Sequence, residues 1–457
     1  MIPYIDFGTK NRMSHAESPF VTHDKPIVVF IDRETLDDGD ELEFLMRQAD
    51  GKRLHVISTQ DEGSAHLEYK ARDDGVLEFE VTMLDGTGGG RYGIPFVQQY
   101  KDIASSPEFT RWGTAEEIER AFIASKTAEN LNAQVFITGD KILLEHKDMG
   151  IISSSYPLTL ADGLALIGLI LRRRNDYAVV ADRQGGSTFT YDHGRWSFFW
   201  HASRDMLPAA WRLVTGCAQM DDRCRDLALT AIQRTSNALK SRDHVHEQIF
   251  LEQSNSSTED AIFYLDYYLI SFTAAFDVLA RIAEEIYQPV SGRGRSVKRV
   301  TWRGRDWLAA LGRQDSALAA LMAPQTTNRD VLDFIARLRN YIHAEGLQGA
   351  THIKNGKKAP LLLHVPEAEV SDIADIITRI GGGSWVVDRP RPNVMFLELG
   401  ELAERITPLA IEALNNLMNA IDITRVPGHD PSKIQTSPPA DWLPAKQIAD
   451  IRRLIGL

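Results

Sequence analysis

The sequence predicts a mixed α/β, strand-rich N-terminal domain over residues 1–200, followed by an all-α helical bundle over residues 201–457. The length of 457 residues suits two or three domains at roughly 150 residues each. Before residue 200, short runs of alternating apolar and polar residues are separated by Asp/Gly turns, as in β-strands. After residue 200, apolar residues recur every third or fourth position almost throughout, as in packed helices.

Composition excludes several classes of protein. The 51 basic and 63 acidic residues give a net charge of −12, which argues against a protein that coats DNA regardless of sequence. With 43% apolar and 25% charged residues, the chain has the composition of a globular protein rather than a disordered one. Two cysteines, Cys217 and Cys224, are too few for a disulfide framework and lack C-x-x-C spacing. We therefore expect a reducing, cytoplasmic environment.

No membrane association is expected from the sequence. The longest apolar run, Gly163 to Leu171, is well short of the about 20 residues that a spanning helix needs. The N-terminus has no cationic region followed by an apolar core, so it does not resemble a signal peptide.

The N-terminal elements follow in order along the chain. Four strands are expected, and a fifth follows a helix that begins at Thr114, where Glu117 completes a capping box. The five strands are expected over residues 25–32, 52–59, 65–71, 76–84 and 133–140. The segment Leu84 to Gly93 contains five glycines and is predicted to be a mobile loop. The strand–helix–strand order at the end of this domain indicates an α/β layer.

The C-terminal domain is expected to be a bundle of long helices with one small insertion. The helices are predicted over residues 221–253, 257–287, 305–323, 328–346 and 399–421. The second is apolar around most of its circumference, which predicts a central position. A hairpin near residues 351–366, with Asn355-Gly356 as its turn, is expected as the insertion.

The strongest chemical pattern lies in the fourth of these helices, which contains Arg337, Arg339, Asn340 and His343. At 100° per residue, Arg339 and His343 are about 40° apart, whereas Arg337 lies about 120° from His343. Gly346 is a candidate terminator of this helix. An imidazole that titrates near neutrality, a guanidinium and an amide suit phosphodiester cleavage, because the histidine moves a proton while arginine neutralises charge on phosphorus.

With this motif, the region from Asp222 to Asp422 resembles the HEPN superfamily, whose hallmark is an Arg, four to six residues and then a His, with a polar residue after the Arg. Arg337 and His343 satisfy the spacing, whereas Arg339 has the polar neighbour Asn340, so the two halves of the pattern select different arginines. The resemblance implies a metal-independent endoribonuclease of the toxin or abortive-infection type. It further implies a homodimer with the site between two motif helices, and a 2′,3′-cyclic phosphate product.

Asp277 could provide the polar partner that many HEPN domains carry on an earlier helix, or it could pair with Arg281 four residues later. The sequence leaves both possibilities open, with a slight preference for the pair.

A second constellation lies in the N-terminal half, where residues 132–146 resemble the late strand of PIN-like nuclease domains. Asp32 and Asp140 each follow a strand, and Glu34 and the acids at positions 116, 117 and 119 lie nearby in the sequence. Carboxylates at the ends of parallel strands would hold Mg²⁺ or Mn²⁺. A scaffold or sensor domain without metal is the more frequent outcome for single acids after strands.

A basic segment, Ser291 to Arg305, stands out on an acidic chain. Flexible Arg/Gly segments with an aromatic residue suit single-stranded RNA, through phosphate contacts and base stacking. The residues expected to contact RNA are Arg293, Arg295, Lys298, Arg299, Trp302, Arg303 and Arg305.

Three hypotheses follow from these patterns. The first is an RNase effector in which the helical domain cuts RNA, with a possible antitoxin or phage trigger as partner. The second is a metal-dependent nuclease that uses Asp32 and Asp140, with the helical half for dimerisation. The third is a non-enzymatic adaptor that binds nucleic acid or protein.

Overall fold

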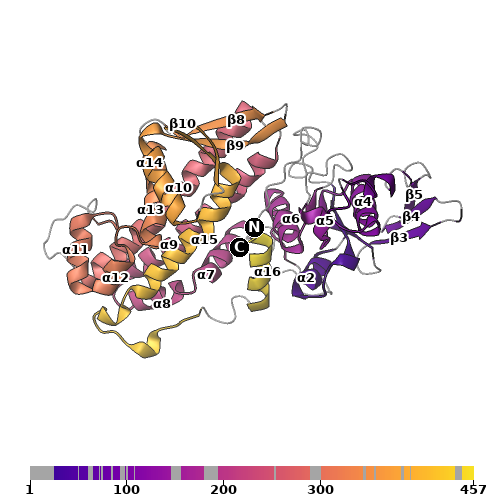
Figure 1. The fold of residues 1–457 in the computed structure, drawn as a ribbon. Coiled ribbons are helices and arrows are strands. Elements are labelled where there is room, and N and C mark those ends of the chain that lie inside the picture. The colour runs from indigo at the N-terminus through magenta and orange to yellow at the C-terminus, as the bar shows by residue number, and fades with distance from the viewer. Residues whose placement is uncertain are drawn as a thin grey trace. The chain divides into compact units, whose positions relative to one another are not determined.

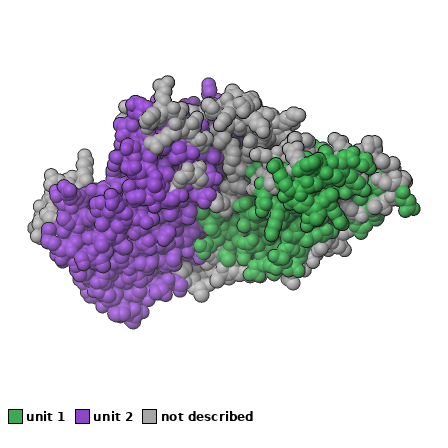
Figure 2. Space-filling view, in the orientation of Figure 1, with its two compact units in different colours: residues 1–194, 449–457 green, residues 195–448 purple. Residues whose placement is uncertain are grey.

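The fold comes from a computed structural model of the chain. It describes residues 25–49, 51–59, 65–71, 73, 76–83, 86–92, 98, 101–107, 109–145, 156–179, 194–251, 254–288, 300–342, 346–354, 357–381, 385–391, 393–437 and 445–457. The chain divides into two compact units, residues 1–194 with 449–457 (unit 1) and residues 195–448 (unit 2) (Figure 2). The predicted boundary at residue 200 lies close to this division. The last nine residues, however, pack with unit 1 rather than with the helical part to which the sequence assigned them.

Unit 1 is built on a seven-stranded sheet in the order β5-β4-β3-β2-β1-β6-β7. Strands β3, β4 and β5 are labelled in Figure 1. Its strands are β1 Ile27–Ile31, β2 Leu54–Ser58, β3 Ala65–Ala71, β4 Leu77–Met83, β5 Gly86–Tyr92, β6 Val135–Ile137 and β7 Pro157–Leu158. Its helices are α2 Asp40–Gln48, α4 Ala115–Asn130, α5 Lys141–Glu145, α6 Leu160–Arg173 and most of α16 Ala445–Ile455, with the short 3-10 turn η1 Arg33–Thr35.

The strand order of unit 1 reverses at β1. Strand β1 pairs in parallel with β2 on one side and with β6 on the other, and β3 and β7 extend this parallel core. Strands β4 and β5 continue the sheet in antiparallel fashion. In open α/β sheets, the carboxyl ends of the strands on either side of such a reversal border a crevice. The residues after β1 and β6 therefore meet at one edge of the sheet.

The parallel core is apolar because both of its faces are covered. In β1, Ile27, Val29, Phe30 and Ile31 are fully buried, as expected for a strand with helices on both faces. On one face, Phe122 of α4 joins a cluster with Phe30 and Phe136, whose rings stack 5.3 Å apart. A Cβ at Gly163 would lie 2.6 Å from Ile137, so glycine allows α6 to approach the sheet closely.

Strands β1 to β4 and β6 confirm the predicted strands, and α4 confirms the predicted helix. The capping box is also present, since Thr114 accepts a hydrogen bond from Glu117 N and the Glu117 carboxylate accepts one from Thr114 N. The prediction of a mobile loop over residues 84–93 was wrong, because Gly86–Tyr92 forms strand β5. Its backbone pairs along the length of β4, for example Phe79 with Gly90, and this ladder requires no side chains.

Unit 2 is mainly helical. Its helices are α7 Gly194–Met206, α8 Ala210–Cys217, α9 Asp222–Phe250, α10 Asn255–Tyr287, α11 Arg305–Gln314, α12 Ser316–Leu321, α13 Thr327–Ile342, α14 Val370–Arg379 and α15 Leu399–Ala420, with 3-10 turns η3 Glu367–Glu369, η5 Ile423–Arg425 and η6 Pro431–Lys433. The long helices α9 and α10 pack against each other, and α13 packs against both α10 and α15. Most of α10 is buried, which confirms its predicted central position.

Unit 2 also contains a four-stranded antiparallel sheet, so the prediction of an all-α domain was incomplete. The strands are β8 Gln348–Lys354, β9 Lys357–Val365, β10 Val386–Arg391 and β11 Val394–Glu398, in the order β10-β11-β9-β8. The pairing of β8 with β9 confirms the predicted hairpin. The second pair, β10 and β11, and helix α14 between the two pairs were not predicted.

The core of unit 2 contains a buried ionic cluster. Glu404 of α15 accepts hydrogen bonds from Arg242 Nη2 at 2.6 Å, and its carboxylate lies 2.7 Å from His246 Nε2. Both partners come from α9, and all three side chains are at least 96% buried. The cluster therefore fixes α15 against α9 inside the helical core.

Helix α10 is the single helix among the described residues that is long and apolar enough to cross a membrane. Of its most apolar window, 61% is buried inside the unit, as in the core helix of a soluble protein. This finding is consistent with the predicted absence of membrane association.

Candidate functional site

Two arginines of the motif have different surroundings in α13. Arg337 forms an ion pair with Glu369 of η3 at 2.5 Å and another with Asp372 of α14 at 2.7 Å. Its guanidinium thus ties the segment after β9 to α13. Arg337 is engaged in holding two elements together.

Arg339 instead interacts electrostatically with Asp277 of α10. Burial raises the pKa of Asp277, and among the charges that counteract this shift Arg339 comes first, ahead of Arg281 and Arg303. The sequence left two possible partners for Asp277, an arginine of the motif and Arg281. Both Arg339 and Arg281 lower the pKa of Asp277. Within the part of the chain that the structure describes, Arg339 has no carboxylate oxygen within 4 Å and makes a 3.4 Å contact with Asn340 Oδ1.

The third motif residue, His343, lies outside the described residues. The structure describes the chain again at Gly346, whose φ is +77°, a left-handed conformation that favours glycine. The Gly346 N–H donates to the Tyr341 carbonyl at 2.9 Å. A left-handed glycine with such a backbone hydrogen bond is typical of the residues that follow a helix end, and α13 is described as far as Ile342.

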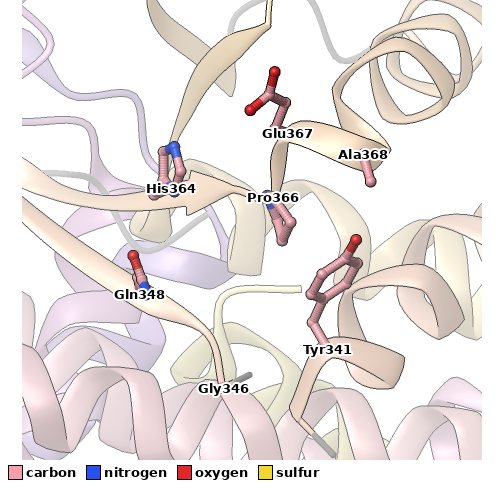
Figure 3. Close-up of a pocket in the computed structure, with 7 residues that line it drawn as sticks. All are labelled: Tyr341, Gly346, Gln348, His364, Pro366, Glu367 and Ala368. Carbon is pink, nitrogen blue, oxygen red and sulfur yellow. The ribbon is translucent and has the colours of Figure 1, made fainter. Parts of the chain in front are cut away.

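A pocket of about 330 Å³ opens at this end of α13 (Figure 3). Its lining comes from the end of the motif helix, the start of β8, the end of β9 and the turn η3. The lining residues are Tyr341, Gly346, Gln348, His364, Pro366, Glu367 and Ala368. We call this cavity the α13 pocket. None of its polar side chains was singled out from the sequence.

Two of these polar residues lie opposite each other in the small sheet. Gln348 of β8 pairs with His364 of β9, and His364 in turn pairs with Phe396 of β11, with ring centroids 5.3 Å apart. The sequence did contain a signal for His364, which interrupts the otherwise apolar run from Leu361 to Val365. A polar residue in such a run points away from the core.

The basic segment gives a mixed outcome. Arg293, Arg295, Lys298 and Arg299 lie outside the described residues. Arg303 pairs with Asp333 of α13 at 2.8 Å, and Arg305 is exposed at the start of α11.

The expected stacking role of Trp302 was wrong. Its ring is completely buried, its Nε1 donates to the Phe276 carbonyl at 2.8 Å, and it contacts Trp307 edge-on. An RNA base cannot reach a ring that has no solvent-accessible face.

In unit 1, the structure brings Asp32 and Asp140 together at the crevice beside β1 and β6. Arg120 of α4 lies between them, with Nη2 2.8 Å from Asp32 Oδ1 and Nη1 3.0 Å from Asp140 Oδ2. Glu34 is a third carboxylate near the same guanidinium, at 3.8 Å. Sequence reasoning selected the acids but missed Arg120, whose side chain reaches them from a separate helix.

The remaining oxygens of these two carboxylates also have protein donors. Thr138 Oγ1 donates to Asp32 Oδ2 at 2.9 Å, and the N–H groups of Ile142 and Leu143 donate to Asp140 Oδ1. Asp32 is 2% exposed, and this burial raises its pKa, whereas Arg120 and Thr138 counteract the shift.

These contacts do not fit a divalent cation. Arg120 lies between the two carboxylates, where a cation bound by both would lie, and its positive charge would repel such a cation. Among the described residues, no group of three His, Cys, Asp or Glu is arranged to hold a metal ion. The arrangement instead ties α4 to the ends of β1 and β6.

Comparison of the chain with protein-family models, with curated proteins and with solved structures finds no match. The inference of function therefore rests on the residues and geometry described above.

Proposed function

We propose that the protein is a HEPN-type endoribonuclease that cuts RNA without a metal ion at the end of α13. The observation that carries this proposal is the different placement of the two motif arginines. Arg337 is held by Glu369 and Asp372, whereas Arg339, which has the polar neighbour Asn340, makes no ion pair with a described carboxylate and interacts electrostatically with the half-buried Asp277. Arg339 is thus the arginine available to a phosphate.

In this mechanism the ribose 2′-hydroxyl attacks the adjacent phosphorus. His343 accepts the hydroxyl proton as the new P–O bond forms, and the bond from phosphorus to the 5′-oxygen breaks. The leaving oxygen takes up a proton, so the products are a 2′,3′-cyclic phosphate and a 5′-hydroxyl. Arg339 neutralises the charge that builds on the phosphoryl oxygens, and Asp277 places a carboxyl group in the electrostatic surroundings of Arg339.

The proposal is tested by incubating the purified chain with single-stranded RNA in EDTA. We expect cleavage that survives chelation and falls by about 100-fold or more in His343→Ala and Arg339→Ala, the usual range for a lost proton-transfer or charge-stabilising group. Glu412→Gln, an exposed change on α15, serves as the control and should cleave normally. Undiminished cleavage by His343→Ala would refute the proposed role.

The same experiment distinguishes the alternatives. Activity that requires Mg²⁺ or Mn²⁺ and is lost in Asp140→Asn would favour the metal-dependent nuclease, although the contacts of Arg120 weigh against it. No cleavage under any condition, together with RNA binding, would favour the adaptor.

A cytoplasmic toxin or anti-phage effector that acts as a homodimer is part of the proposal. Growth arrest on expression, abolished by His343→Ala, tests the toxin role. The mass of the particle in solution tests the dimer.

A further inference from the structure

The α13 pocket has the features of a site that selects one nucleotide. We propose that it binds a guanine base of the single-stranded RNA that is cut. This inference rests on the proposed function, because it assigns the substrate class of the same helix end. Its lining of an aromatic ring, a proline ring and polar groups at the edge is suited to a flat, polar ring system.

The size of the pocket fits one base with part of its ribose. Its volume of about 330 Å³ is near the lower end of the range of roughly 300–1,000 Å³ seen for small-ligand sites. A folded duplex would not enter, whereas a base turned out of a single strand would.

Two rings provide stacking surfaces. Tyr341 of α13 and Pro366, which follows β9, both line the pocket, on the side away from Gln348 in the view of Figure 3. Stacking between aromatic side chains and bases tolerates any base, because every base has a π-face. These two residues therefore account for binding but not for choice of base.

We assign the base specificity of the pocket to Glu367, which lies at its rim. Its Oε1 accepts a hydrogen bond from Asn393 Nδ2 at 2.5 Å, which orients the carboxylate. A carboxylate has two acceptor oxygens and suits two parallel N–H donors. Among the four RNA bases, guanine alone presents such a pair, N1–H and N2–H. Gln348 and His364 lie on the other side of the pocket, where they can meet the remaining polar edge.

The pocket and Arg339 lie on different sides of the same helix end. At 100° per residue, Tyr341 projects about 160° from Arg339 but only about 40° from Arg337. An RNA strand that reaches both sides of the helix would place one phosphate at Arg339 and the base of another nucleotide in the pocket. The ion pairs of Arg337 with Glu369 and Asp372 hold the pocket wall in place before RNA arrives.

The test measures binding of fluorescein-labelled UUGUU, UUAUU and UUIUU by anisotropy, with the His343→Ala chain as the non-cleaving parent. Inosine lacks only the N2 amino group of guanine. We expect UUGUU to bind about tenfold more tightly than the other two, as for one bidentate contact. Glu367→Gln should reduce the difference between guanine and inosine to less than about twofold, whereas Tyr341→Leu should weaken all three by a similar factor. Glu412→Gln, added to the same parent, should behave like it.

Equal affinity for the guanine and inosine oligonucleotides would overturn the proposed specificity. A guanine preference that persists in Glu367→Gln would overturn the assignment of Glu367. Mapping cuts made by the active chain separates this inference from the proposed function. Cleavage without a guanine bias would refute the guanine specificity of the α13 pocket but not the nuclease activity. Guanine-selective binding without cleavage would refute the nuclease activity but not the specificity of the pocket.

Discussion

Removal of the Arg120 guanidinium should selectively loosen the sheet of unit 1. In Arg120→Met, the Asp32 carboxylate keeps only 2% exposure but loses its ionic partner at 2.8 Å, and Asp140 loses its contact at 3.0 Å. Breaking a fully buried ion pair costs about 3–5 kcal/mol. Because the Arg120 side chain is 37% exposed, water replaces part of the lost interaction, and we expect a loss of about 2 kcal/mol.

Hydrogen exchange measures this loss locally. A loss of about 2 kcal/mol corresponds to roughly 30-fold faster exchange of the amides of β1 and β6, at about 1.4 kcal/mol for each tenfold change. Exchange in α9 of unit 2 should be unchanged. Arg111→Met, which removes an exposed arginine from the same unit, is the matched control and should leave the β1 and β6 rates unaltered.

The effect should depend on pH with a definite sign. Burial already raises the pKa of Asp32, and Arg120 is the largest influence that lowers it, so Arg120→Met raises this pKa further. The folded variant then binds a proton more tightly than the unfolded chain. The loss of stability of Arg120→Met relative to the wild type is therefore greatest above the raised pKa of Asp32. This loss becomes smaller as the pH falls below that pKa. Exchange rates equal to wild type at neutral pH, or a deficit that grows in acid, would refute this reasoning.

Three further perturbations test other parts of the fold. Burial and the neighbouring Glu401 raise the pKa of Glu398 to about 7, so its ionisation costs stability as the pH rises from 4.5 toward 7. Glu398→Gln should gain about 2 kcal/mol in urea unfolding at pH 8 and nothing at pH 4, and equal gains at both values would contradict the assignment. Burial alone would raise the pKa of Glu404, but Arg242 lowers it to about 2. The ionised Glu404 therefore stabilises the fold above about pH 4.5, and this contribution to the free energy of unfolding is lost as the pH falls toward 2. Glu404→Ala should lose about 3–5 kcal/mol at pH 7, and a change below 1 kcal/mol would show that the pair is dispensable. A Cβ at Gly168 would lie 2.0 Å from the Leu454 carbonyl oxygen, so Gly168→Ala should expose the amides of α16 to rapid exchange. Unchanged protection there would mean that α16 is held elsewhere.

The local elements could be predicted because their determinants are adjacent in the sequence. A continuous β-branched apolar run predicted β1, alternating apolar residues predicted β2 to β4, and the Thr114–Glu117 pair predicted the start of α4. The apolar circumference of α10 predicted its central position. Each of these signals depends on the period of a strand or helix, or on contacts within one turn.

The site could be predicted only in part, because side chains take their roles from partners on distant elements. The spacing in α13 could not distinguish the two motif arginines, since Glu369 and Asp372 reach Arg337 only after η3 and α14 fold back. Arg120 is 88 residues from Asp32, and no local pattern joins them. The basic residues around Trp302 predicted an exposed ring. In the fold, however, this ring donates a hydrogen bond to the carbonyl of Phe276, a core residue.

By itself, the sequence determined strands β1 to β4 and β6, the start of α4, the central position of α10 and the helix that contains Arg337 and Arg339. Tertiary structure alone decided that a glycine-rich segment becomes β5, that the last nine residues join unit 1, and that Glu369 and Asp372 bind Arg337 rather than Arg339. The physical reason is the range of the interactions. Periodicity and capping act over one to four residues, whereas ladder pairing, burial and charge compensation depend on groups that only the folded chain brings together.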